Sequence, residues 1–294
     1  MKLLQLIRAN NLFLIILTQI IVKYFISNQR KGLRSTLSSG LNDVDFTLLL
    51  ACTVIIAAAG YIINDYCDYD LDHRAGKNVG HFTKDVLLSI YQGLVMFGAA
   101  LSLFLAIRVD LIDLYWFYPG ATVLLLLYSS HLKPTGLPAN ILVSSFTSAV
   151  VGIVILSEYR CGVLVHTSAL EVLYAFMLFA FLTNLFREII KDAEDYDADF
   201  AFGLQTLPIR IGLDRSRLVA AFLGMIGMSI VLSFAVFHPF LTTIAQTHTI
   251  LLIFLPLSYL VYKTFRASHQ KDYSYISRGL KILMLAGLTL LLYP

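Results

Sequence analysis

The stretch Asn64-Asp65-Tyr66-Cys67-Asp68-Tyr69-Asp70-Leu71-Asp72 places four carboxylates within eight residues, directly after an uninterrupted apolar run. A second stretch, Lys191-Asp192-Ala193-Glu194-Asp195-Tyr196-Asp197-Ala198-Asp199, repeats the spacing D-x-x-D-x-x-x-D and also follows an apolar run. We therefore expect the chain to be organised around these two acidic motifs, which apolar helices would present to each other.

The spacing of the acids is that of one helix face. At about 100° per residue, positions i, i+3 and i+7 lie within about 60° of one another. Each motif thus predicts one acidic stripe: Asp65, Asp68 and Asp72 in the first, and Asp192, Asp195 and Asp199, preceded by Glu188, in the second. Asp70 and Asp197 point roughly the opposite way and are predicted to face solvent.

An acidic stripe needs a cation, because carboxylates on one face raise one another's pKa. Mg²⁺ fits such a stripe, since it takes a few carboxylates and leaves its other positions to water and phosphate. The alternative is that acidic runs are solvated surface. Two equal spacings, each at the end of an apolar segment, favour the metal site.

The composition is that of a polytopic membrane protein. Apolar residues make up 58% of the 294 residues and charged residues 14%, and the mean hydropathy is +0.76, well away from an ordinary globular domain. The three cysteines form no C-x-x-C and the seven histidines show no metal-ligand spacing, which argues against zinc, iron–sulfur and disulfide frameworks. The net charge of +3 includes no basic run that would suggest nucleic acid.

Nine apolar segments have membrane-spanning length. They lie near residues 11–27, 45–63, 86–107, 112–129, 140–157, 169–186, 217–237, 243–264 and 276–293. The sequence therefore predicts an all-α bundle of nine transmembrane helices, arranged as two four-helix halves plus one, in a single domain over residues 1–294. With nine spans, sixteen Lys and Arg residues lie on the side of the acidic motifs and six on the other, so both motifs are expected to be cytoplasmic.

The two motifs, together with the tail Gly203-Leu204-Gln205-Thr206-Leu207-Pro208-Ile209-Arg210-Ile211-Gly212, resemble the UbiA superfamily of intramembrane prenyltransferases. Arg8-Ala9-Asn10-Asn11 and the segment from Tyr128-Ser129 to Lys133 extend the resemblance over nearly the whole chain. The resemblance implies a helical bundle that binds Mg²⁺ and, through it, the diphosphate of an allylic prenyl donor, whose prenyl group passes to a lipophilic acceptor.

The resemblance and the residues together give the candidate site. The expected metal ligands are Asp65, Asp68, Asp72, Asp192, Asp195 and Asp199. Among these, Asp65, Asp68, Asp192 and Asp195, together with Lys191, are expected to serve catalysis. The expected substrate-binding residues are Asn11, Asn64, Arg74, Lys77, Tyr128, Lys133 and Arg187. Cations are included because they hold diphosphate oxygens; for Lys133 and Arg187 the alternative is snorkelling at a helix end.

Two further readings remain open at this point. A divalent-cation transporter would also use carboxylates, although transport sites lie near the bilayer midplane and these motifs lie at helix ends. A terpene cyclase on the same scaffold would need no acceptor. Within the prenyltransferase reading, the run Arg187-Glu188-Ile189-Ile190-Lys191-Asp192 resembles both lipid-forming members, which prenylate a prenylglycerol phosphate, and quinone-pathway members, which prenylate an aromatic precursor.

Overall fold

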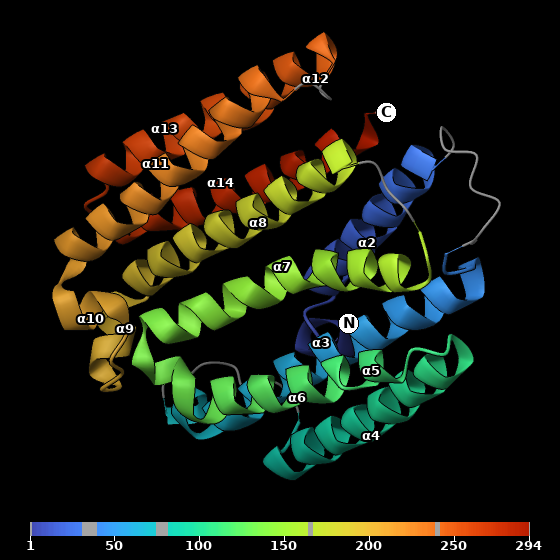
Figure 1. Ribbon diagram of the computed structural model, residues 1–294. Coiled ribbons are helices and arrows are strands. Elements are labelled where there is room, and N and C mark those ends of the chain that lie inside the picture. The colour runs from blue at the N-terminus through green and yellow to red at the C-terminus, as the bar shows by residue number, and fades with distance from the viewer. Residues whose placement is uncertain (1, 31–39, 75–81, 164–166, 239–241, 294) are drawn as a thin grey trace. The chain divides into compact units, whose positions relative to one another are not determined.

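The computed structural model describes residues 2–30, 40–74, 82–163, 167–238 and 242–293, and within these ranges every regular element is a helix (Figure 1). Helices suit a bilayer because each satisfies its own backbone hydrogen bonds. Eight of them are long and apolar enough to cross a membrane: Ala9–Gln29, Asp43–Asp70, Lys84–Arg108, Leu137–Arg160, Thr167–Glu194, Leu213–Phe237, Thr243–Arg266 and Gln270–Leu292. This confirms an all-helical polytopic membrane fold with eight candidate spans in the described part of the chain.

The segment predicted as a span at 112–129 is divided. It forms α5 (Ile112–Tyr115), α6 (Phe117–Leu127) and the π-helical turn η1 (Tyr128–Leu132). The break has a local cause, because Pro119 has no backbone N–H to donate to the carbonyl of Tyr115; the next helical bond runs from the Gly120 N–H to the Trp116 carbonyl, at 3.0 Å. The count of nine spans is therefore not confirmed.

The chain divides into two compact units. Unit 1 comprises residues 1–20, 35–133 and 153–164, and unit 2 comprises 21–34, 134–152 and 165–294. The long helices α2 (Ala9–Arg30) and α7 (Leu137–Arg160) contribute residues to both units. The predicted arrangement as two four-helix halves plus one is not confirmed.

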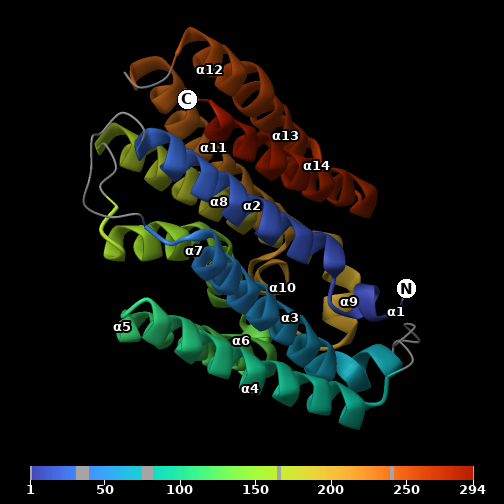
Figure 2. The same ribbon diagram turned by 90° about the vertical axis from the view of Figure 1, so that its right-hand side faces the viewer.

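Unit 1 is built on one long helix. In it, α3 (Asp43–Arg74) packs along α4 (Lys84–Arg108) and α6, which Figure 2 shows side by side. The short helix α1 (Lys2–Leu6) precedes the first half of α2. Inside the unit the Gln19 amide donates to the Thr53 hydroxyl at 3.0 Å, and the Tyr118 hydroxyl lies 3.1 Å from the same oxygen, so polar side chains of these apolar helices pair with one another.

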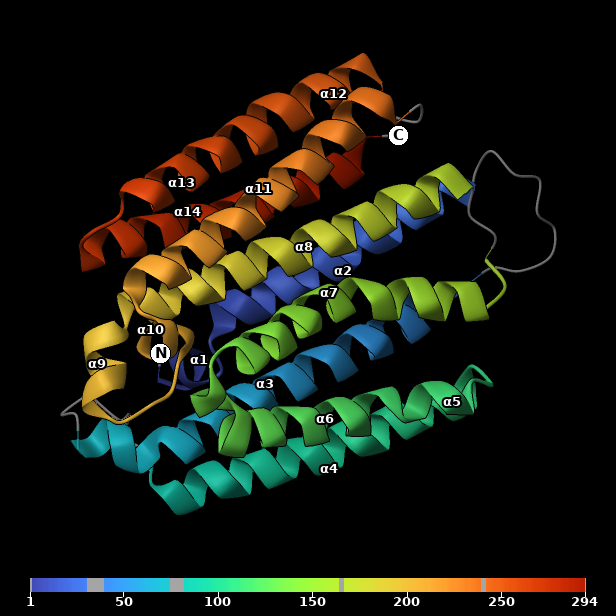
Figure 3. The same ribbon diagram turned by 60° about the vertical axis from the view of Figure 1, so that its left-hand side comes forward.

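Unit 2 is organised around α8 (Thr167–Glu194). Helices α11 (Leu213–Phe237) and α14 (Gln270–Leu288) both pack along α8, and α13 (Leu255–Arg266) packs on α11 and α14. The unit is completed by α9 (Tyr196–Ala201), α10 (Leu207–Ile211), α12 (Thr243–His248), the π-helical turn η3 (Thr249–Phe254), and the 3₁₀ turns η2 (Lys133–Thr135, of which Lys133 belongs to unit 1) and η4 (Thr289–Leu292). Figure 3 shows α9 and α10 at the end of α8.

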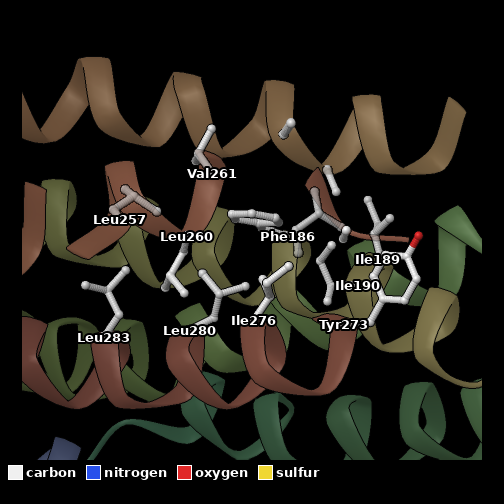
Figure 4. Close-up of a cluster of buried hydrophobic side chains, with 14 of the residues drawn as sticks. Phe186, Ile189, Ile190, Leu257, Leu260, Val261, Tyr273, Ile276, Leu280 and Leu283 are labelled. Carbon is white, nitrogen blue, oxygen red and sulfur yellow. The ribbon is translucent and has the colours of Figure 1, made fainter. Parts of the chain in front are cut away.

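The core of unit 2 fixes the position of α8. Buried apolar side chains follow one another every three or four residues on the facing helices: Phe186, Ile189 and Ile190 on α8, Leu257, Leu260 and Val261 on α13, and Ile276, Leu280 and Leu283 on α14 (Figure 4). On α11, Ala220, Ala221 and Gly224 leave room for close approach. A Cβ on Gly224 would lie 2.5 Å from Val261 Cγ2 and 2.9 Å from Phe186 Cε1.

We expect Gly224→Ala to destabilise unit 2 by about 1–3 kcal/mol, because the added methyl overpacks a closed core. Gly227→Ala is the matched control on the same helix, since its Cβ would meet Leu257 Cδ2 at an ordinary 3.7 Å and alanine favours helix over glycine by about 1 kcal/mol. Thermal unfolding of both purified variants in detergent checks the prediction; equal midpoints would contradict it.

Candidate functional site

The first acidic motif lies on the last turns of α3, which continues as one helix to Arg74. Helical spacing separates its acids as the sequence predicts. The side chains of Asp65 and Asp68 are 32% and 18% exposed, whereas that of Asp70 is 64% exposed and pairs with Lys84 at 2.5 Å. Asp65 and Asp68 thus form the sheltered face of the motif and Asp70 the solvent face.

Cations from distant parts of the chain meet this sheltered face. Arg8 Nη2 donates to Asp65 Oδ1 at 3.2 Å, and Lys133 Nζ pairs with Asp68 Oδ2. Asn64 Nδ2 donates to the same Asp68 oxygen at 3.0 Å. These contacts bring Asn64 and Lys133 to the two aspartates, and Arg8 and Lys133 give the carboxylates the positive partners that sheltered acids require.

The contact between Arg8 and Asp65 was not predicted. Arg8 takes a left-handed backbone conformation, with φ of 50°, in the turn between α1 and α2. Its guanidinium lies 5.0 Å from the centre of the Tyr61 ring. An arginine at the head of the first apolar segment is the signal that the sequence offered. Only the turn, which aims the side chain at α3, makes it a partner of Asp65.

The second acidic motif is not one continuous helical stripe. Helix α8 ends at Glu194, the chain bends at Asp195, and α9 begins at Tyr196. The helix dipole explains the break: carboxylates are unfavourable near a helix C-terminus and favourable in a first turn. Ending α8 at Glu194 therefore places Asp197 and Asp199 in the first turn of α9, so the predicted single stripe from Asp192 to Asp199 is wrong.

Asp192 is the sheltered acid of the second motif. It accepts a hydrogen bond of 2.8 Å from the side-chain amide of Asn140, and Asn140 is only 7% exposed. Asn140 was not predicted; its signal is an amide in the first turns of an apolar span, two residues after Pro138. Asp195 and Lys191 are exposed, and Asp199 is half-buried.

The glycine-rich tail positions the start of α7. The Gln205 N–H donates to the Pro134 carbonyl at 3.1 Å. Gly136 has φ of 76°, and a Cβ there would lie 2.7 Å from the Leu207 nitrogen, so only glycine permits this approach of two backbones. The Asn140 N–H donates to the Gly136 carbonyl at 3.1 Å, so the packing of this turn against the tail helps to set the position of the amide that holds Asp192.

The remaining predicted residues divide into three groups. Arg187 is half-buried on α8 and pairs with Glu188 at 2.5 Å. Asn11, in the first turn of α2, and Tyr128, at the start of η1, are half-buried and each has an interaction partner. Lys77 lies outside the described residues, as do the side chains of Asp72 and Arg74.

The described carboxylates suit a hard cation that keeps other ligands. Among the described residues there is no group of three or more His, Cys, Asp or Glu side chains able to hold a metal. Asp65 and Asp68 offer carboxylate oxygens on one helix face. Mg²⁺ is bound in this manner, through one or two carboxylates with water and phosphate oxygens, so the donor set fits Mg²⁺ with a phosphate ligand.

Comparisons with known proteins agree with this chemistry. The model of the UbiA prenyltransferase family matches residues 35–285. A digeranylgeranylglyceryl phosphate synthase from Korarchaeum cryptofilum is 31% identical over 246 residues, which are 78% of this chain and 80% of that protein.

Solved structures show the same fold. One that concerns digeranylgeranylglyceryl phosphate synthase in membranes has a TM-score of 0.69 at 22% identity, covering 99% of this chain and 96% of the other. A UbiA homologue from Archaeoglobus fulgidus bound to DMAPP and Mg²⁺ has a TM-score of 0.60 at 14% identity, with 100% of both chains covered.

We expect Asp68→Ala to weaken Mn²⁺ binding by about tenfold or more, since even groups beside metal ligands change affinity by 10–100-fold. Asp70→Ala is the matched control two residues away, and its exposed pair with Lys84 should leave binding within about twofold. Electron paramagnetic resonance titration of Mn²⁺ with inorganic diphosphate present measures both. If the two variants lose affinity equally, the sheltered face is not the metal face.

Proposed function

Because the chain belongs to the UbiA prenyltransferase family, we propose that it transfers a prenyl group from an allylic prenyl diphosphate to a hydroxyl of a prenylglycerol phosphate. The bond between the allylic carbon and the diphosphate oxygen breaks, and an ether bond to the acceptor oxygen forms. Diphosphate and the hydroxyl proton are released. The observation that carries the proposal is the sheltered pair Asp65 and Asp68 with Lys133 beside it.

The metal ligands that we propose are those of the two motifs: Asp65, Asp68, Asp72, Asp192, Asp195 and Asp199. Bound Mg²⁺ would neutralise the negative charge that develops on the leaving diphosphate. The fit rests on the carboxylate oxygens of Asp65 and Asp68 and on the Mg²⁺ and DMAPP held by the Archaeoglobus homologue. Such stabilisation is strongest where water is scarce, which suits the half-buried ends of apolar helices.

The cations of the chain have a different task. Lys133 now lies on Asp68 and Arg8 on Asp65. With a metal ion held by these carboxylates, Lys133 and Arg8 would bind the diphosphate oxygens, for which their donors are suited. We propose the same role for Arg74, Lys77 and Lys191, and a phosphate-binding role for Arg187.

Polar groups near the first motif would complete the donor subsite. Asn64 holds Asp68 through its amide, which fixes that carboxylate for metal binding. We propose that Asn11 and Tyr128, polar side chains at a helix start and in a π-helical turn, contact substrate oxygens. Apolar and aromatic walls would shield the allylic cation from water.

The acceptor assignment rests on relatives. The relatives compared are named digeranylgeranylglyceryl phosphate synthases, which favours a prenylglycerol phosphate over an aromatic quinone precursor. A divalent-cation transporter does not fit membership of an enzyme family. A cyclase without an acceptor is the remaining alternative, and product analysis separates it from the proposal.

We also propose how this multi-pass integral membrane protein is placed in the bilayer. With α5, α6 and η1 acting together as a ninth crossing, both acidic motifs lie on the cytoplasmic side. The excess of Lys and Arg in the loops of that side supports this orientation. The whole chain, residues 1–294, would act as one prenyltransferase domain.

Purified protein should convert an allylic diphosphate and a prenylglycerol phosphate to the corresponding ether, identified by mass. Activity should vanish with excess chelator and return with Mg²⁺ or Mn²⁺, because the carboxylates need a divalent ion to face diphosphate. A panel of donors from five to twenty carbons, with hydroxybenzoate and dihydroxynaphthoate as competing acceptors, tests the assignment. Full turnover in chelator, or product from the aromatic acceptors alone, would overturn it.

A ninth crossing places Ile112 and Ser130 on opposite sides of the membrane. Both are exposed, so cysteines introduced there in a chain lacking Cys52, Cys67 and Cys161 should react with an impermeant maleimide. Ser130→Cys should be labelled from the cytoplasmic face and Ile112→Cys from the other. Labelling of both from one face would show that α5, α6 and η1 do not cross.

A further inference from the structure

Arg187 on α8 has a buried donor without an acceptor. Its Nη1 donates to Glu188 Oε1 at 2.5 Å, whereas its Nε is buried and has no hydrogen-bond partner among the described residues. An unsatisfied buried donor is costly, more so on a charged group. The Arg187 Nε–H is therefore available to donate a hydrogen bond to an acceptor from a bound ligand.

Lys281 brings a second cation to the same place. Helix α14 packs along α8, and Leu280 lies in the core with Phe186 and Ile190 (Figure 4). Lys281, the next residue after Leu280, is half-buried and lies close enough to Arg187 for their charges to repel. With Glu188 included, the three formal charges are +1, +1 and −1, which sum to +1. A half-buried net positive charge favours an anion.

Arg187 lies before the second acidic motif and not within it. On α8, Arg187 and Lys191 are one turn apart on one stripe, while Glu188 and Asp192 form the neighbouring stripe about 100° around the helix. Arg187 precedes Asp192 by five residues, about 7.5 Å of rise. An anion held by Arg187 is therefore near the metal-binding acids but not among them.

We infer that Arg187 and Lys281 form the subsite for the phosphate of the acceptor, separate from the cations that hold the donor diphosphate. The inference rests on the proposed function and names the residues that would recognise the acceptor substrate of that function. A phosphate monoester presents several acceptor oxygens, one for the Arg187 Nε–H and another for the Lys281 ammonium. Ile282, 67% exposed beside Lys281, continues the subsite as an apolar surface for the acceptor chain.

The subsite would position the acceptor without taking part in bond changes. Its lipid chain runs along the apolar helices, its phosphate is held at Arg187 and Lys281, and its free hydroxyl reaches toward the level of Asp192. Two charged contacts thereby orient the acceptor hydroxyl, the nucleophile, toward the donor, and such orientation lowers the barrier to reaction. A neutral prenylglycerol would lose this orientation.

The test compares Lys281→Met with the wild type in lipid nanodiscs. We expect the KM for the phosphorylated acceptor to rise about tenfold to a hundredfold, the worth of a charged hydrogen bond, with the KM for the donor and the Mg²⁺ requirement unchanged. With the phosphate-free prenylglycerol, wild type and variant should be equally poor. Lys281→Arg should restore most of the affinity. Arg278→Met, an exposed cation one turn earlier on α14, is the matched control and should change nothing.

Each other outcome overturns the inference. A rise in the KM for the donor would assign the two cations to the diphosphate. An equal loss with the phosphate-free acceptor would make Lys281 structural. A defect that depends on anionic lipid content would assign the subsite to a lipid headgroup.

A direct binding measurement keeps the subsite separate from the activity. Glycerol 1-phosphate should raise the unfolding temperature of the wild type and of Arg278→Met, but not that of Lys281→Met. If no prenyl transfer occurs with any acceptor while this difference persists, the proposed function fails and the phosphate subsite stands. If the wild type transfers prenyl groups but shows no such difference, the subsite fails alone.

Discussion

Carboxylates at the ends of apolar helices need positive partners, and this requirement brings remote segments of the described chain into contact. Burial of an unpaired charge is far more costly than burial of a pair. In unit 1 the partners come from remote parts of the chain: Arg8 from the turn before α2 for Asp65, and Lys133 from the turn after η1 for Asp68. The acids of α3 therefore fix the ends of other elements.

The two acidic motifs solve the same electrostatic problem differently. Helix α3 continues past its acids, and the cations Arg8 and Lys133 offset their charge. Helix α8 instead stops at Glu194, and the acids that follow occupy the first turn of α9, where the helix dipole favours them. In the second motif the sheltered acid Asp192 is held by a neutral amide, that of Asn140. Equal spacing in sequence thus gave unequal local structure, because the neighbouring helices supply different partners.

The sequence predicts those features that depend on composition and local spacing. Eight spans follow from apolar length, since a bilayer leaves few alternatives to a helix, and the separation of Asp68 from Asp70 follows from 100° per residue. The break before α6 was readable from Pro119 but was hidden by the apolar run around it. Arg8, Asn140 and Lys281 could not be assigned, because their roles depend on which helices pack together. Packing of this kind is set by residues such as Gly224 and Gly136, whose neighbours lie far along the chain.

The arrangement on α8 bears on how one enzyme could handle two phosphorylated substrates. Donor diphosphate and acceptor phosphate repel each other, so both can approach only if each has its own positive partners. Groups on α8 and α14 would provide this: Asp192 lies on the stripe of α8 that would take a metal ion, whereas Arg187, on the neighbouring stripe of α8, and Lys281 of α14 would take a phosphate directly. The core of Phe186, Ile190 and Leu280 holds α8 and α14 in register, so the spacing between the two stripes is set by packing. A scaffold of this kind can keep the carboxylate stripe for ionising the donor and vary the neighbouring stripe to choose the acceptor.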